Sequence, residues 1–164
     1  MRKSIRALMV AAALAGSLAV VLPAAAFAYW PVADRYAWVS QGYWSGHKAY
    51  DIAAPSGTHI MPIWGGRVVF AGWKSNDCGG RQVWVYNGNG VYTTYYHMSK
   101  ITSWVGEWVA SQKTTIGHVG ESGCATGPHV HVEVWHGKPW ASGSYRVNPW
   151  NALDRGYWLP YRYR

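Results

Sequence analysis

Glycine and proline interrupt most of this chain at short intervals, and the segments between them are rich in Val, Tyr, Trp and Thr. No window of a dozen residues shows the apolar period of an amphipathic helix, whereas these residue types favour strands. The sequence therefore predicts a mostly β fold. We expect strands at Arg67 to Trp73, Gln82 to Asn87, Val91 to His97, Thr115 to Val119 and His129 to Trp135.

The segment Asn87-Gly88-Asn89-Gly90 lies between two of these expected strands. Asn-Gly pairs readily adopt the positive φ angles of tight turns, so the two strands should form a hairpin. The sequence has no internal repeats or low-complexity linkers, and it contains twelve Trp and twelve Tyr. These aromatic residues could fill a small β core or line a groove, and we expect most of them in the core.

The amino terminus has the pattern of a signal peptide. Three cations within the first six residues precede an uncharged run rich in Ala, Leu and Val, and Ala26-Phe27-Ala28 supplies small residues for cleavage. We expect a signal peptide at 1–28 and one domain of about 136 residues at 29–164, a length that allows a real core. An uncleaved membrane anchor is the alternative, but the apolar run is shorter than the roughly 20 residues that span a bilayer.

The chain is basic, with a net charge of +8, of which about +5 would remain after removal of the signal peptide. The remaining Lys and Arg are scattered, which suits general attraction to an anionic surface. A nucleic-acid-binding domain would have a dense basic stripe, and only the tail Tyr161-Arg162-Tyr163-Arg164 resembles one. We therefore expect no nucleic-acid partner, and no stable membrane insertion after signal cleavage.

Two cysteines, Cys78 and Cys124, are present. An even number of cysteines in an exported protein favours a disulfide, because exported proteins meet an oxidising environment. Zinc binding by these cysteines is the alternative interpretation, but neither lies in a Cys-x-x-Cys pair. We expect a bridge that closes a span of about 46 residues.

Histidine gives the clearest indication of chemistry. Alternation along the last expected strand puts His129, His131 and Glu133 on one face and valines on the other. Two imidazoles about 7 Å apart on one strand can address the same small site. His47 and Asp51 lie in an earlier glycine-rich stretch and add two further accepted zinc ligands. Two His and one Asp leave a fourth position for water, as in catalytic zinc sites, and spacing does not decide which strand histidine would bind.

Three segments, in this order, resemble the signatures of the lysostaphin/LytM-type zinc endopeptidases: Gly46 to Pro55, Tyr95 to Ser99 and Gly123 to Glu133. The similarity also covers Gly65 to Val69 and Ile116 to Gly120. The motif core therefore runs over about 42–148, nearly the whole expected domain. The resemblance implies a single antiparallel β-sheet domain with zinc in a narrow groove.

The resemblance also implies roles for five residues. The family's zinc ligands match His47, Asp51 and His131, which predicts one zinc ion per chain. Its two catalytic histidines match His97 and His129, which would polarise the zinc-bound water and stabilise the oxyanion. No His-Glu-x-x-His segment is present, so the base should be a histidine, and which of the two acts as base stays open.

Several other positions near these motifs need separate expectations. Glu133 could hydrogen-bond a zinc ligand, or fill an ordinary surface or core position. The family usually has Gly where this chain has Ala49, and a residue other than cysteine where it has Cys124. A bridge from Cys124 would tie together two loops beside the groove. No catalytic role is expected for the three remaining histidines, His59, His118 and His136.

Together these features predict a secreted, monomeric zinc metalloendopeptidase. It would hydrolyse peptide bonds of bacterial peptidoglycan, in the stem peptide or the cross-bridge, by a zinc-activated water outside the cell, in the wall or the periplasm. Aromatic groove walls such as Tyr95, Trp44 or Trp73 could shape the choice of bond, which the sequence does not identify. The alternative is a catalytically silent wall-binding or amidase-activating domain, and the intact ligand set argues against it. Own-wall remodelling and attack on other bacteria would use the same chemistry.

Overall fold

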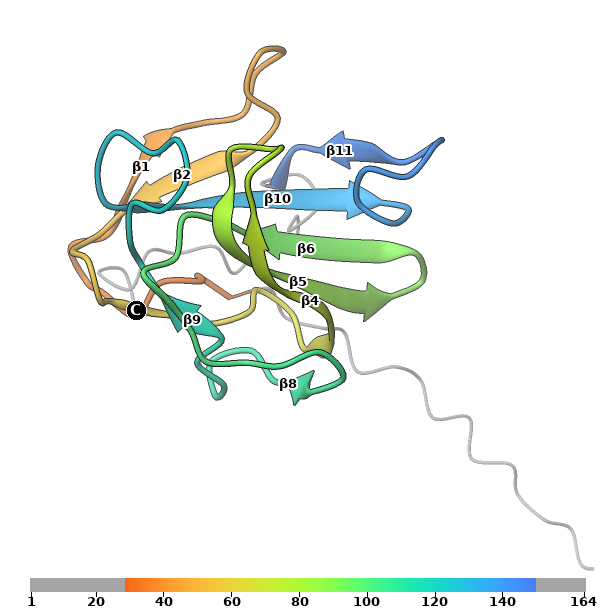
Figure 1. Ribbon diagram of the computed structural model, residues 1–164, viewed down its shortest axis with the longest axis horizontal. Helices are drawn as coiled ribbons and strands as arrows, with labels where there is room; N and C mark the ends of the chain where they lie inside the picture. The colour runs from red at the N-terminus through yellow and green to blue at the C-terminus, as the bar shows by residue number, and fades with distance from the viewer. Residues whose placement is uncertain (1–28, 150–164) are drawn as a thin grey trace, which may run out of the picture.

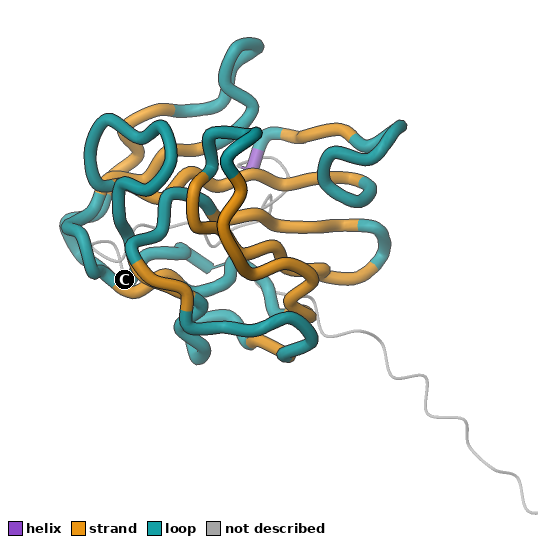
Figure 2. The backbone as a smooth tube through the Cα atoms, viewed as in Figure 1, coloured by secondary structure: helices purple, strands orange, loops and turns teal. Residues whose placement is uncertain are grey.

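The computed structural model describes residues 29–149 and contains two antiparallel sheets (Figure 1). The expected signal peptide and the tail after 149 lie outside the described residues. Figure 2 shows that strands and loops make up nearly all of the described chain. The strand pairs are antiparallel, which confirms the predicted mostly β, antiparallel fold. The strands are β1 (Trp38–Gln41), β2 (Tyr50–Ala53), β3 (His59–Ile60), β4 (Gly66–Lys74), β5 (Gly80–Gly88), β6 (Val91–Tyr95), β7 (Lys100–Ile101), β8 (Trp108–Val109), β9 (Gly117–His118), β10 (His129–His136) and β11 (Tyr145–Val147).

Strand β10 occupies the middle of the larger sheet. The order of this sheet is β1-β2-β10-β6-β5-β4-β8, and β11 pairs with β10 at its far end. β10 thus has β2 on one side and β6 on the other, so residues far apart in the sequence become neighbours (Figure 1). A smaller second sheet, of order β3-β9-β7, was not expected.

The β5–β6 hairpin confirms the turn that the Asn-Gly pairs predicted. Gly88, Asn89 and Gly90 have φ angles of 92°, 49° and 73°, so all three use the left-handed region that such turns require. β6 ends at Tyr95, two residues before the predicted end. The reason is His97, whose φ of 62° is incompatible with a continuing strand.

The core lies on the side of the larger sheet to which the valines of β10 point. Val130 and Val132 are fully buried there with Ile52, Val85 and Tyr95. The alternate residues of β10 point to the opposite face, so the polar groups of this strand are kept out of the main core. Burial of the valines on one face of β10 thus holds His129, His131 and Glu133 on the opposite face.

The expectation that most aromatic residues fill the core is wrong for tryptophan. Ten tryptophans lie between residues 29 and 149, and six of them are exposed. The core of this small domain is filled mainly by Val and Ile side chains from the strands, which leaves little room for larger rings. The exposed tryptophans are Trp38, Trp44, Trp73, Trp104, Trp108 and Trp140.

Within the described residues, no helix has the length and apolar character needed to cross a membrane.

Candidate metal centre

Three side chains that the sequence singled out converge where β2 meets β10. Asp51 and His131 are directly opposite each other in the β2–β10 ladder, and Asp51 Oδ1 lies 2.7 Å from His131 Nδ1. His47 precedes β2 and turns its Nε2 atom to within 3.2 Å of Asp51 Oδ2 and 3.3 Å of His131 Nδ1. One ligand atom from each residue lies within 4.8 Å of the others.

The orientation of His47 is fixed by its backbone surroundings. An isolated bridge pairs His47 with Trp44 and forms a tight turn before β2. Its Nδ1 atom is 2.9 Å from the carbonyl oxygen of Gly42, which can only accept, so Nδ1 carries the proton. The lone pair of Nε2 is therefore free to face the cluster.

The cluster fits a zinc ion by its chemistry. Two imidazole nitrogens and one carboxylate oxygen are a donor set that zinc accepts, and three protein ligands are typical of catalytic sites. Burial alone would raise the pKa of Asp51, but its hydrogen bond to His131 and the nearby histidines hold that pKa below its ordinary value. Burial alone would lower the pKa of His131, but Asp51 and Glu133 raise it to about 9. Metal binding would therefore release a proton from His131.

His97 and His129 lie beside this cluster with their rings 4.7 Å apart between centroids. His97 Nδ1 is 2.8 Å from the carbonyl oxygen of Ser122, and His129 Nδ1 is 2.9 Å from that of Gly127. Each Nδ1 must donate to its carbonyl, which leaves each Nε2 able to accept a proton. Burial lowers the pKa of His97 to about 4, so this ring stays neutral at neutral pH.

A disulfide joins the two loops that hold His97. Cys78 and Cys124 are bonded, which confirms the expected bridge and excludes the alternative of zinc binding by these sulfurs. Beside the bridge, the Cys124 N–H donates to the Cys78 carbonyl. The adjoining residues hold the backbone of His97: its N–H donates to Gly79, and its carbonyl accepts from Ser122.

Glu133 follows His131 on the same face of β10 and is buried, with an exposed fraction of 2%. Burial alone would raise the pKa of Glu133, but hydrogen bonds and nearby charge, His131 first, lower it to about 2. His131 Nε2 is 3.4 Å from Glu133 Oε1, so of the two roles considered for Glu133 the structure shows the hydrogen bond to a candidate ligand, from a buried position. The other donors to this carboxylate are Thr94 Oγ1, Tyr96 Oη, Trp135 Nε1 and Arg146 Nη1, at 2.6 to 3.1 Å.

The remaining histidines lie away from the cluster, as expected. His59 and His118 face each other in the smaller sheet, and the ring of His136 stacks on Tyr145 at the far end of β10. Ala49 is fully buried and is not among the residues with positive φ, so it needs no glycine-like backbone.

One aromatic expectation was wrong. Tyr95 is fully buried in the core, where its hydroxyl accepts from the Ile63 N–H, so it does not line the site. Its neighbour Tyr96 lies at the site instead, with its ring 5.2 Å from that of His131 between centroids. Sequence reasoning missed Tyr96. The register between β6 and β10 places Thr94 opposite Glu133 and hence Tyr96 on the same face, and no local sequence signal specifies that register.

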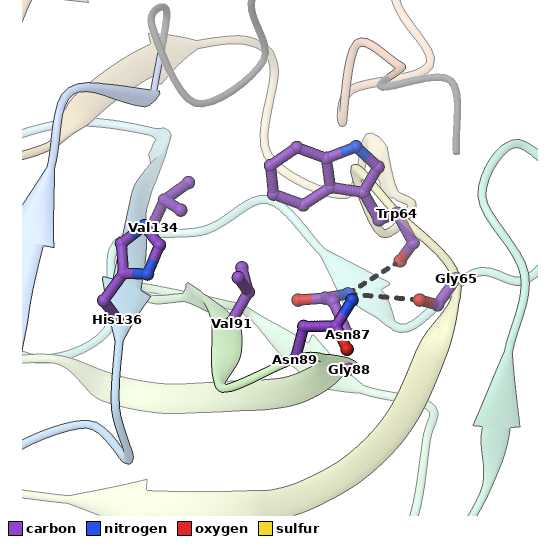
Figure 3. A pocket seen from close by; sticks show the side chains of 8 residues that line it. All are labelled: Trp64, Gly65, Asn87, Gly88, Asn89, Val91, Val134 and His136. Atoms are coloured by element: carbon purple, nitrogen blue, oxygen red, sulfur yellow. Dashed lines mark hydrogen bonds between the residues drawn. The ribbon is translucent and has the colours of Figure 1, made fainter. Parts of the chain in front are cut away.

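A separate pocket of about 340 Å³ lies between the carboxyl end of β10 and the β5–β6 hairpin (Figure 3). Trp64 forms one wall, and the amide nitrogen of Asn87 donates to the carbonyl oxygens of Trp64 and Gly65. Val134 and His136 line it from the face of β10 opposite to His131. None of the five residues with predicted site roles lines this pocket.

The fold and the His-Asp-His cluster define a metallopeptidase domain. The chain belongs to peptidase family M23, whose profile matches residues 45–149. The matched range includes all five residues with predicted site roles, and the family assignment confirms the resemblance to lysostaphin/LytM-type enzymes.

Individual relatives agree with this assignment. The DD-carboxypeptidase/endopeptidase Mpg of Neisseria meningitidis is 37% identical over 91 residues, which cover 56% of this chain and 20% of Mpg. The solved structure of the antimicrobial peptidase lysostaphin from Staphylococcus simulans has a TM-score of 0.62 at 28% identity, covering 73% of this chain and 50% of that one. A zinc containing peptidase from Vibrio cholerae has a TM-score of 0.59 at 27% identity. The match covers 66% of this chain and 36% of that one. The chain spans about a fifth of the length of the curated relatives Mpg and lysostaphin.

Proposed function

We propose that this protein is a secreted zinc metalloendopeptidase that hydrolyses peptide bonds in bacterial peptidoglycan. The observation that carries the proposal is the convergence of His47, Asp51 and His131, with two further histidines beside them, in a domain of a peptidase family. The substrate class is inferred from a relative in Vibrio cholerae that is named peptidoglycan DD-endopeptidase ShyA and is 36% identical over 94 residues. The stem peptide and the cross-bridge are both candidate targets, and the protein acts as a monomer.

In this proposal, one zinc ion would be held by an imidazole nitrogen of His47, an imidazole nitrogen of His131 and a carboxylate oxygen of Asp51. These three atoms already face one another across the β2–β10 ladder and its preceding turn. Zinc supplies a Lewis acid that polarises a peptide carbonyl and makes water a nucleophile near neutral pH.

His97 and His129 perform the proton chemistry. Both rings have Nδ1 fixed by a backbone carbonyl, and the Nε2 atom of His129 lies 3.8 Å from Asp51 Oδ1, so either Nε2 can take a proton from the attacking water. The other ring, once it carries a proton on Nε2, can donate to the oxyanion of the tetrahedral intermediate. Burial lowers the pKa of His97 to about 4, so its ring is unprotonated at neutral pH, although the same burial weakens it as a base.

The main alternative is a catalytically silent domain that binds the wall or activates an amidase. Such a domain has no need for a complete ligand set, and it has no need for two histidines locked in one tautomer. Both features are present in this protein, and both support a hydrolase.

The decisive experiment is mass spectrometry of fragments released from purified peptidoglycan by the protein, with and without a chelator. We expect peptide-bond cleavage that stops when metal is removed and returns with zinc, and an Asp51→Ala variant should release nothing. Cleavage that continues undiminished in metal-free protein would contradict the proposal. Amino-terminal sequencing of the exported protein should start at Tyr29, because we place signal cleavage after Ala28.

A further inference from the structure

The carboxylate of Glu133 is buried beside a candidate metal ligand and has five hydrogen-bond donors around it. Taking a carboxylate out of water costs several kcal/mol unless charged and hydrogen-bonded partners replace the solvent. This carboxylate receives donors from three strands, β6, β10 and β11, and from the residue that follows β6. The five donors are Thr94, Tyr96, His131, Trp135 and Arg146.

The two oxygens of Glu133 have different partners. Oε2 accepts from Tyr96 and Trp135, both at 2.7 Å, and from Thr94. Oε1 faces Arg146 at 2.6 Å and the ring of His131 at 3.4 Å. The carboxylate is therefore held from one side, and its other oxygen is directed to the candidate ligand.

The ring of His131 needs an acceptor at this position. When Nδ1 binds a metal, it gives up its proton, and the remaining ring proton must sit on Nε2. Buried N–H groups are almost always paired, and Glu133 Oε1 is the acceptor in contact with Nε2 among the described residues. The ring proton of His47 is on Nδ1 and is donated in a hydrogen bond to the neutral carbonyl of Gly42. His131 differs because its partner is charged.

Arg146 keeps this charged partner in place. Its guanidinium donates to Glu133 Oε1 and lies over the rings of Trp135 and Trp140, at 5.3 and 5.6 Å from their centroids. Trp135 packs on Trp140 in turn. The rings of Trp135 and Trp140 thus cover one side of the Arg146 guanidinium.

We propose that Glu133 is a positioning residue of the metal centre. Its carboxylate accepts a hydrogen bond from the Nε2–H group of His131 and thereby orients the Nδ1 atom of His131 toward the metal. This inference rests on the proposed function, because it assumes that His131 is a ligand. A carboxylate acceptor fixes the tautomer and the ring orientation, and it makes the ligand nitrogen a stronger donor. Removal of such partners typically weakens metal binding by about 10- to 100-fold.

The first test uses the unaltered protein, labelled with nitrogen-15 and loaded with zinc. Nuclear magnetic resonance of the ring nitrogens should place the His131 proton on Nε2, and this proton should exchange slowly with water. The corresponding proton of His47 should be on Nδ1, which provides an internal comparison. A His131 proton on Nδ1, or one that exchanges as freely as in isolated imidazole, would overturn the inference.

The second test measures zinc affinity by competition with a chelator. Glu133→Gln keeps the size of the side chain and removes its charge, and we expect about 10- to 100-fold weaker zinc binding. Glu107→Gln is the matched control, because the carboxylate of Glu107 contacts the backbone N–H of Trp104 in an exposed turn. It should bind zinc as the unaltered protein does.

The outcomes separate this inference from the proposed function. If the unaltered protein binds no zinc, the proposed function itself fails. If it binds zinc and cuts peptidoglycan while Glu133→Gln binds zinc equally well, only the role of Glu133 is overturned. If Glu133→Gln does not fold, the resonance measurement on the unaltered protein still decides the question.

Discussion

The bridge between Cys78 and Cys124 should control both the stability of the domain and the geometry of His97. It closes a loop with a sequence separation of 46 residues. In the chain-entropy model a loop of this length is worth about 4 kcal/mol near room temperature. A variant with both cysteines changed to serine should therefore lose about 4 kcal/mol of unfolding free energy, which urea titration followed by tryptophan fluorescence would measure.

The same variant should lose activity without losing metal. The bridged loops supply the carbonyls of Gly79 and Ser122 that fix His97, whereas neither cysteine contacts His47, Asp51 or His131 in the described structure. Small displacements of a catalytic group can cost about 100-fold in rate, so peptide hydrolysis should fall by about 10- to 100-fold at full zinc content.

The control for this variant is Ser75→Ala, in the same turn, where the Ser75 carbonyl and not its side chain contacts the Cys78 N–H. It should match the unaltered protein in both measurements. The reasoning is refuted if the double serine variant stays within about 1 kcal/mol of the unaltered protein in stability. It is also refuted if zinc and activity are lost together.

Two further predictions concern the histidines. His131→Ala should lower zinc content and hydrolysis together, whereas His129→Ala and His97→Ala should keep zinc and lose about 100-fold or more in rate; zinc loss in His129→Ala but not in His131→Ala would reverse the assignment. The metal-free protein should be most stable near pH 6.5, the ordinary histidine pKa, as urea titrations between pH 4.5 and 8.5 would show. Below this pH, His97 binds a proton in the unfolded chain but not in the folded protein, where its pKa is lowered to about 4. The free energy of unfolding therefore decreases as the pH falls. Above it the unfolded chain releases a proton that His131, with its pKa raised to about 9, retains, so stability falls as pH rises; a stability that increases steadily from pH 6.5 to 8.5 would contradict this account.

The long strands and the shared face of three candidate site residues could be predicted from local patterns. Alternation along β10 correctly placed His129, His131 and Glu133 on one face, because side chains on a strand repeat every two residues. The Asn-Gly turn likewise marked the β5–β6 hairpin. Both signals are contained within a few consecutive residues.

Features that depend on distant pairing could not be predicted in this way. β3, β7 and β8 have two residues each, too few for any periodic pattern, and they exist because neighbouring segments pair with them. β9 lies within the strand predicted at Thr115 to Val119 but is limited to Gly117 and His118. The same limitation explains the choice between Tyr95 and Tyr96. Which of two adjacent tyrosines faces His131 depends on the β6–β10 register, and the sequence alone does not specify that register.

The position of β10 in the sheet also makes the candidate metal centre depend on two distant parts of the chain. Asp51 precedes His131 by 80 residues. The two residues become neighbours because β10 pairs with β2 on one side and with β6 on the other. A chain that ended before β10 would keep His47 and Asp51 but would lack His131, so it could not assemble the three candidate ligands.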